Sequence, residues 1–135
     1  MKPKNINNFT TEIGTSFNDI LKKISKNLFG IIFLVDKNNK LIGSIGDGDI
    51  RRYILKYKNI KEKVNLNSKL INKKVKVIYV EDKEKKLFNL LERGFKVVPK
   101  LNKKRQIIDI CTYKNIRNIR SKRTFLHKNI LKRIC

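Results

Sequence analysis

Apolar residues along the first half of the chain alternate between helical spacing and short continuous runs. Residues 17–28 carry apolar side chains three and four positions apart, which is typical of a helix with one buried face. Thr15 and Ser16 precede this stretch and can accept a bond from a first-turn amide, and Gly30 follows it. The whole pattern predicts a helix at 17–28, a buried strand at 31–35, a turn at 36–40, a strand at 41–45 and a helix from Gly48.

The same pattern returns 66 residues later, and the offset holds without gaps. Apolar residues match apolar residues, for example Leu21 with Leu87. Proline cannot donate to a strand ladder, so we expect Pro99 at an edge or entry position. Each copy alone would expose an apolar sheet face, so the two are expected to form one pseudo-symmetric α/β domain. The second copy predicts a helix at 83–93, a strand at 95–101, a turn at 102–105, a strand at 106–112 and a helix from Tyr113.

The repeat divides the chain into four segments. The segment between the copies is polar except for one short apolar pair, Leu70 and Ile71. The segment after the second copy is rich in arginine and has no acidic residue, so we treat it as a tail. The predicted organisation is a first repeat at 1–59, a connector at 60–74, a second and degenerate repeat at 75–117, and a basic tail at 118–135.

The large net charge of the chain is weak evidence for nucleic-acid binding. The chain has 135 residues and a formal net charge of +23, from 34 Lys and Arg against 11 Asp and Glu. Lysine outnumbers arginine 26 to 8, whereas phosphate and base recognition favours arginine. Lysine, isoleucine and asparagine all have AT-rich codons, so base drift explains most of the charge. Nucleic-acid binding through the basic tail stays open as an alternative function.

One stretch, residues 43–52, stands out with three glycines, two acidic residues and two arginines. A strand end, a glycine turn and a helix start favour the approach of an anion. There Asp49 can accept from ribose hydroxyls, and Arg52 can pair with a phosphate. Alternatively, Asp47 and Asp49 only cap the helix and complement its dipole. The spacing alone supports both interpretations.

These residues resemble the first repeat of a CBS-domain pair, or Bateman module. The resemblance rests on residues 34–36, 41–44 and 47–52, and more weakly on 99–102. It is strongest for the version that precedes a sugar-phosphate nucleotidyltransferase domain. It implies tandem β-α-β-β-α repeats that form one pseudo-twofold module and assemble as a homodimer. It also implies a regulatory protein without catalytic residues that binds an adenosine nucleotide such as AMP, ADP or ATP.

The nucleotide motif of that family carries a glycine, a hydroxyl, an aspartate and a basic residue at intervals of three. The first repeat matches it at Gly43, Asp49 and Arg52 but has Gly46 at the hydroxyl position. The second repeat has the hydroxyl as Thr112, but Asp109, Asn115 and Asn118 replace the other three. We therefore expect a weakened first site and a second site that is empty or occupied only through neighbouring residues. The residues expected at the nucleotide are Gly43, Ser44, Gly46, Asp49, Arg52 and Thr112.

The resemblance leaves the partner and the form of regulation open. The regulated partner would be a nucleotidyltransferase domain or subunit, and the alternative is a degenerate module that only dimerises or scaffolds. The sequence contains no cysteine or histidine spacing for a metal and no catalytic couple, so we expect no metal and no enzyme activity. No apolar run is long enough to span a membrane, which leads us to expect a cytoplasmic protein.

Overall fold

The computed structural model of the chain describes residues 2–57 and 69–112. The chain divides into two compact units, with the boundary between Val75 and Lys76. Each unit contains one three-stranded sheet and is described here by itself. The helix predicted from Tyr113, residues 60–68 of the predicted connector and the tail at 118–135 lie outside the described residues.

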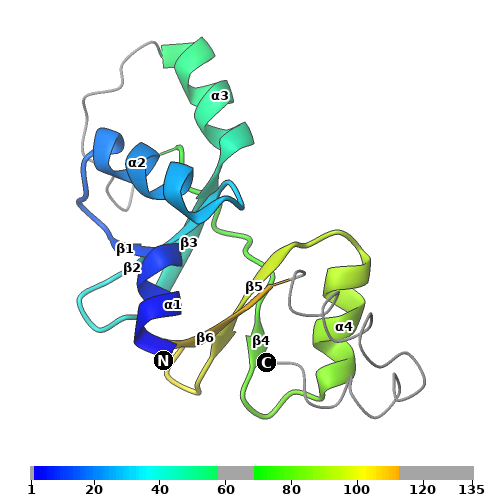
Figure 1. The fold of residues 1–135 in the computed structure, drawn as a ribbon. Helices are drawn as coiled ribbons and strands as arrows, with labels where there is room; N and C mark the ends of the chain where they lie inside the picture. Colours follow the sequence, from blue (N-terminus) through cyan, green and yellow to red (C-terminus); the bar gives the residue numbers. More distant parts are fainter. Residues whose placement is uncertain (1, 58–68, 113–135) are drawn as a thin grey trace. The chain divides into compact units, whose positions relative to one another are not determined.

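The first unit places its helices around a sheet in the order β1-β2-β3. Strand β1 runs parallel to β2, and β2 runs antiparallel to β3 (Figure 1). The four elements predicted from the apolar pattern are confirmed as α2, β2, β3 and α3. The elements are α1 (Lys2–Phe9), β1 (Thr10–Glu12), α2 (Phe17–Asn27), β2 (Ile31–Val35), β3 (Leu41–Gly46) and α3 (Asp47–Tyr57).

Helix α2 begins and ends as its flanking residues dictate. The Ser16 hydroxyl accepts from the amide of Asp19 at 3.2 Å, which satisfies one first-turn donor. Leu28 takes the left-handed conformation at φ 66° and ends the helix, with Gly30 two residues later at φ 69°. The chain can therefore reverse at once into β2.

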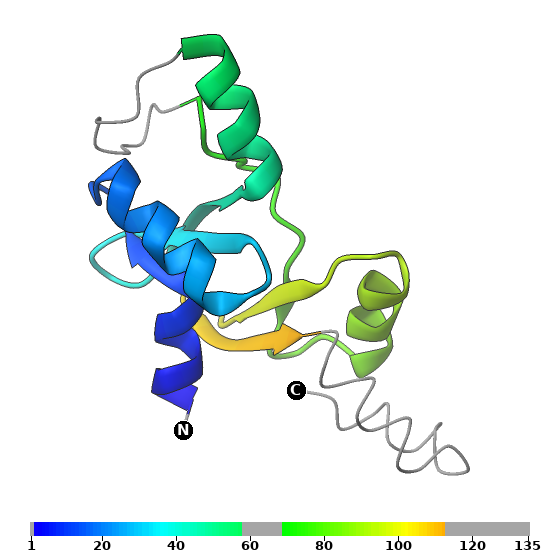
Figure 2. The same cartoon turned by 45° about the horizontal axis from the view of Figure 1, so that its top comes forward.

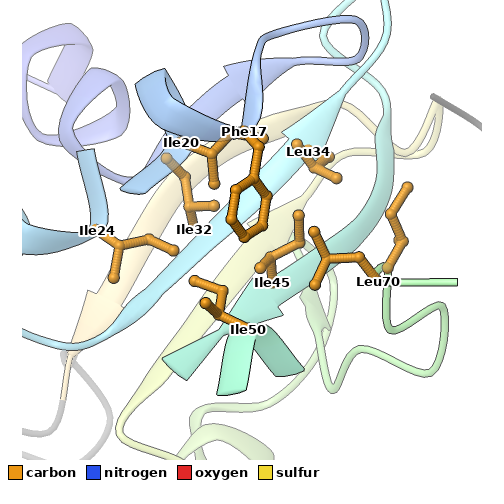
Figure 3. Close-up of a cluster of buried hydrophobic side chains, with 9 residues drawn as sticks. Phe17, Ile20, Ile24, Ile32, Leu34, Ile45, Ile50 and Leu70 are labelled. Atoms are coloured by element: carbon orange, nitrogen blue, oxygen red, sulfur yellow. The ribbon is translucent and has the colours of Figure 1, made fainter. Parts of the chain in front are cut away.

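Apolar side chains from all layers of the first unit meet between α2 and the sheet. In Figure 3, Phe17 and Ile20 of α2 face the side chains of Ile32 and Ile45. Leu70 and Ile71, from the predicted connector, are buried in this same core at 3% and 8% exposure. The first unit therefore continues past α3 as far as this pair. The cluster consists of Phe17, Ile20, Ile24, Ile32, Leu34, Ile45, Ile50, Leu70 and Ile71.

Side chains of α2 bind the end of α1. The Lys23 ammonium donates to the carbonyls of Asn7 at 3.2 Å and Thr10 at 2.6 Å, and its partial burial lowers the pKa of Lys23. The Asn27 amide donates to the carbonyl of Asn8 at 3.3 Å. The last carbonyls of a helix have no partner within it, so these bonds fix α1 on the first unit.

The second unit repeats the same order of elements from β4 onward. Its sheet has the order β4-β5-β6, with β4 parallel and β6 antiparallel to β5; the elements can be followed by colour in Figure 2. Its core includes Leu87 and Leu91 of the helix and Val98 of β5. The elements are β4 (Ile78–Tyr79), α4 (Glu84–Glu92), β5 (Val97–Leu101) and β6 (Ile107–Thr112).

The expectation that Pro99 lies at an edge or entry position was wrong. Strand β5 is the central strand of its sheet, and Pro99 lies in its middle, opposite Ile110. Proline is accommodated because β4 is short and pairs only with Lys100 and Leu101. On the β4 side, the missing N–H of Pro99 therefore interrupts no pairing.

The two hairpin turns confirm the 66-residue repeat at the level of single bonds. The Asp36 carboxylate accepts from the amides two and four residues later, at 2.8 and 3.0 Å. The Asn102 side-chain carbonyl accepts from the equivalent amides at 2.9 and 3.0 Å. Asn39 and Arg105 both take positive φ, at 65° and 64°. The same side-chain geometry thus shapes both turns.

Candidate functional site

The carboxylate of Asp49 joins the start of α3 to two other groups. Its Oδ2 accepts from the backbone amide of Gly46 at 2.9 Å, and its Oδ1 accepts from Nη2 of Arg52 at 2.7 Å. The capping role considered for Asp49 is therefore present. Each carboxylate oxygen has a second lone pair, so the bonds to Gly46 and Arg52 leave acceptor capacity for a ligand.

Arg52 is accessible despite this ion pair. Its side chain is 75% exposed, against 23% for the side chain of Asp49. An exposed ion pair of this kind contributes little to stability. Its guanidinium has further donors that can bind a phosphate.

Asp49 and Arg52 line a small basic pocket in the first unit. The pocket has a volume of about 150 Å³. Four described lining residues belong to α3, and Arg52 and Tyr53 lie three and four positions after Asp49 and four and three positions before Lys56, which places them on one face of the helix. Among the described lining residues, three side chains are cationic and one is a carboxylate already paired with Arg52. The described lining residues are Asp49, Arg52, Tyr53, Lys56, Lys69 and Leu70.

Four described lining residues were not predicted as site residues from the sequence: Tyr53, Leu70 and the two lysines, Lys56 and Lys69. Lys56 lies seven positions after Asp49, and helical spacing from Asp49 was a signal that could have found it. Lys69 had no such signal because its place depends on the packing of the neighbouring Leu70 in the core. Because lysines are frequent throughout the chain, neither Lys56 nor Lys69 stands out in the sequence.

The structure gives Gly43 and Ser44 packing roles. A Cβ on Gly43 would collide with Cγ2 of Ile71 and lie 2.7 Å from the carbonyl oxygen of Asn72. Ser44 exchanges two backbone hydrogen bonds of 2.9 Å with Asn72 and is 3% exposed. The segment that carries Leu70 therefore runs alongside β3 and pairs with it at Ser44. Gly43 and Ser44 are not among the described residues that line the pocket.

Gly46, at the hydroxyl position, has room for a side chain. A Cβ there would lie 3.5 Å from the carbonyl oxygen of Gly30 and 3.7 Å from Oδ2 of Asp49, which are ordinary contacts. Its φ is not positive, unlike that of Gly30. Neither the backbone nor the packing requires glycine at this position.

Thr112 is the last residue of β6 and belongs to the second unit, where it is 7% exposed and pairs with Val97. It does not line the basic pocket of the first unit. Asn115 and Asn118 lie outside the described residues. The structure thus brings Gly46, Asp49 and Arg52 together and places Thr112 in a different unit.

The described ranges 2–57 and 69–112 contain neither a group of side chains suited to a metal ion nor a membrane-spanning helix. There, no group of three or more histidine, cysteine, aspartate or glutamate side chains could hold a metal ion. No described helix is both long and apolar enough to span a bilayer.

A comparison with known protein families finds a match within the first unit. A family model described as "CBS domain" matches residues 4–56. Uncharacterized proteins from two strains of Helicobacter pylori are 42% identical over 50 residues, which are 37% of this chain. The match spans only 15% of each of these relatives.

Solved structures extend the similarity to both units. A CBS domain protein from Streptococcus pneumoniae TIGR4 has a TM-score of 0.76 at 14% identity, covering 93% of this chain and 81% of its own. CBSX2, solved in complex with AMP, has a TM-score of 0.67 at 18% identity, with coverages of 87% and 91%. The cytosolic domain of the Mg²⁺ channel MgtE, in complex with ATP, has a TM-score of 0.64 at 14% identity, with coverages of 82% and 44%. The chain therefore has the mixed α/β fold of CBS domain pairs.

Proposed function

We propose that the chain is a non-catalytic regulatory module that binds an adenosine nucleotide at the first unit and controls a partner domain or subunit. The observation that carries this proposal is the Asp49 carboxylate, which accepts from the Gly46 amide and from Arg52 and lines a basic pocket together with Arg52. AMP, ADP and ATP are the candidate ligands.

Each group at this site has a chemical task. The remaining lone pairs of Asp49 accept from the two ribose hydroxyls. Arg52 exchanges part of its contact with Asp49 for a phosphate, a stronger charge-assisted partner. Because Gly46 supplies no hydroxyl, the site lacks one neutral hydrogen bond, a loss of about 0.5–1.5 kcal/mol of binding free energy. Gly43 and Ser44 contribute by shaping the strand that leads into this turn.

The second unit contributes less to nucleotide binding. Its motif keeps the hydroxyl of Thr112 but has Asp109 in place of the glycine, and Asp109 accepts from the amide of Ile110 at 2.8 Å. Asparagines stand at the ribose-binding and phosphate-binding positions of the motif. We therefore propose that only the first unit holds a nucleotide through its own motif.

The comparisons support the proposals that the chain binds a nucleotide and that it acts on a partner domain or subunit. Two similar folds were solved with AMP and with ATP, as their names state. A match of 50 residues that spans 15% of each Helicobacter pylori relative implies relatives more than twice as long as this chain. We propose that such additional chain holds the regulated activity, and a sugar-phosphate nucleotidyltransferase is our candidate.

Isothermal titration calorimetry with AMP, ADP and ATP tests the nucleotide site. We expect binding by the wild-type chain and a loss of at least about tenfold in affinity for Asp49→Asn combined with Arg52→Gln. Asp19→Asn combined with Arg51→Gln is a matched control, because Asp19 also lies in the first turn of a helix and Arg51 neighbours the pocket without lining it. Absence of heat with all three nucleotides, or equal effects of both double variants, would refute the assignment.

Self-association is a second candidate role, favoured by two exposed apolar side chains on α3. Ile54 is 38% exposed and Leu55 is 74% exposed. A second copy of the chain could cover them, as expected for a homodimer. Sedimentation should show a dimer for the wild-type chain and a smaller species for Leu55→Glu. A wild-type monomer at all concentrations would exclude this role.

A further inference from the structure

We infer that Lys69 binds the phosphate next to the ribose, as a phosphate-binding residue that the nucleotide motif does not include. This inference rests on the proposed nucleotide site and deepens it by naming a second cation for that phosphate. Arg52 occupies the basic position of the motif, whereas Lys69 lines the same pocket from outside α3. The phosphate is then bound from two separate segments of the chain.

The three cations among the described lining residues differ in whether they already have a partner. Arg52 donates to the Asp49 carboxylate at 2.7 Å, and Lys56 also has an interaction partner. Within residues 2–57 and 69–112, Lys69 makes no hydrogen bond, ion pair or ring contact. Lys69 can therefore engage a phosphate without giving up a contact in this part of the chain.

The backbone beside Lys69 is held by the core of the first unit, although the side chain of Lys69 is exposed. The next two residues, Leu70 and Ile71, are 3% and 8% exposed, and Leu70 lies among the core side chains in Figure 3. Asn72 then exchanges two backbone hydrogen bonds of 2.9 Å with Ser44 of β3. These contacts fix the path of the chain beside the pocket, so binding has to order only the side chain of Lys69.

The charge of the described lining suits one phosphate group when Lys69 takes part. Three cations and one carboxylate give this lining a net charge of +2. A phosphate monoester carries about 1.5 to 2 negative charges at pH 7. Without Lys69 the net charge of the described lining would be +1, and part of the phosphate charge would have no counterpart. Lys69 thus completes the charge that a single phosphate group requires.

The test must separate a contact to the phosphate from the basic character of the whole chain, because a net charge of +23 attracts any anion. Lys69→Gln removes the charge from the lining, and Lys69→Arg keeps it. Lys73→Gln is the matched control, because Lys73 is an exposed lysine shortly after the same segment and is not among the described lining residues.

Calorimetric titrations of adenosine, AMP and ATP, at about 0.15 M salt to screen distant charges, give the first readout. Lys69→Gln should weaken AMP and ATP by about threefold to tenfold and leave adenosine, which has no phosphate, within about twofold. Lys69→Arg should keep most of the affinity for AMP. Lys73→Gln should change none of the three ligands by more than about twofold. Circular dichroism of each variant checks that the fold is kept.

Phosphorus-31 NMR of bound AMP gives a second readout that a purely structural role of Lys69 would not move. A nearby ammonium favours the dianion, so the pKa of the bound phosphate should lie below that of free AMP. Lys69→Gln should raise this pKa back toward that of free AMP, and Lys73→Gln should leave it unchanged.

The outcomes distinguish this inference from the function on which it rests. Equal losses of AMP affinity for Lys69→Gln and Lys73→Gln, or an equal loss for adenosine, would overturn the phosphate contact of Lys69 and leave the nucleotide site in place. A phosphate pKa that is the same in Lys69→Gln and the wild-type chain would do the same. Failure of the wild-type chain to bind AMP and ATP would overturn the nucleotide proposal and this inference with it.

Discussion

Gly46 stands at the hydroxyl position of the motif on which the proposed nucleotide site rests, and the structure leaves space for a hydroxyl there. A Cβ there meets only ordinary contacts at 3.5 and 3.7 Å. We expect Gly46→Ser to restore one hydrogen bond to the ligand and to raise nucleotide affinity by about twofold to tenfold. Calorimetry should show no such gain for Gly46→Ala, which adds the carbon without the hydroxyl. If the alanine variant gains affinity, or the serine variant does not, then a missing hydroxyl at residue 46 does not limit nucleotide binding.

Gly43 is the same residue type in the same motif, yet its environment predicts the opposite response. A Cβ there collides with Ile71 and with the backbone carbonyl of Asn72, neither of which is the end of a flexible side chain. We expect Gly43→Ala to lower the free energy of unfolding by about 1–3 kcal/mol, measured by urea denaturation. Gly46→Ala is the reference and should cost less. Equal stabilities would contradict the close approach of the segment to β3.

Leu28 is a third residue whose surroundings predict its response to substitution. It takes φ 66°, a conformation that disfavours a side chain, and it is 89% exposed, so little burial would be lost. We expect Leu28→Gly to raise the free energy of unfolding by about 0.5–1 kcal/mol, seen as a higher Tm. Leu28→Ala keeps the Cβ and should give no such gain. A lower Tm for the glycine variant would indicate a contact made by the leucine.

At the scale of elements, the turn between β4 and α4 depends on a charge. Oδ2 of Asp82 accepts from the amide of Tyr79 at 2.8 Å and from Lys86 at 3.1 Å. The hydrogen bond from the Tyr79 amide, followed by the Lys86 charge, lowers the pKa of Asp82. The unfolded chain therefore binds this proton more readily than the folded one. The stabilisation is present above the unfolded pKa of about 3.9 and is lost as the pH falls through the lower folded value.

We expect Asp82→Asn to remove that part of the pH dependence. The wild-type chain should lose stability relative to the variant as the pH falls below about 4. At neutral pH the difference should stay below about 1 kcal/mol, because solvent screens the exposed pair with Lys86. Urea denaturation of both chains between pH 7 and 3 measures it. Parallel pH profiles would show that Asp82 does not contribute through its charge.

The apolar pattern of the sequence predicted the elements that bury one face and missed those that do not. Helix α2, its two following strands and their equivalents in the second unit each place several apolar residues in a core. Strands β1 and β4 have three and two residues, too few to show a period, and were expected only through the family resemblance. Helix α1 was missed because side chains of another element, Lys23 and Asn27, hold its end.

The same distinction explains the candidate site. Asp49 and Arg52 are three positions apart on one helix, so local spacing predicted that both would serve one site, although their ion pair was not predicted. The packing of Leu70 beside α3 depends on the tertiary core and carries no local signal. The sequence therefore predicted Asp49 and Arg52 as site residues but not Lys69, which lines the pocket from outside α3.

At the scale of the whole molecule, the two units share a fold but differ at the motif positions on which the proposed nucleotide site rests. The first unit has the aspartate and the basic residue of the motif, whereas the second has asparagine at both positions. A ligand that binds only the folded state stabilises it by about 2.7 kcal/mol at a concentration of 100 Kd. If the first unit supplies the site, that stabilisation should be concentrated there.

Hydrogen exchange with and without saturating ATP measures this distribution. We expect exchange to slow most at the amides of β3 and α3 and of residues 69–72, which surround Asp49 and the pocket. The amides of β5 and β6 should slow less, because the second unit lacks both ligand-binding groups of the motif. In the Asp49→Asn, Arg52→Gln variant the slowing should disappear at the same nucleotide concentration. Equal slowing in β6 would mean that the second unit shares the ligand and would give Thr112 the binding role that its sequence position predicts.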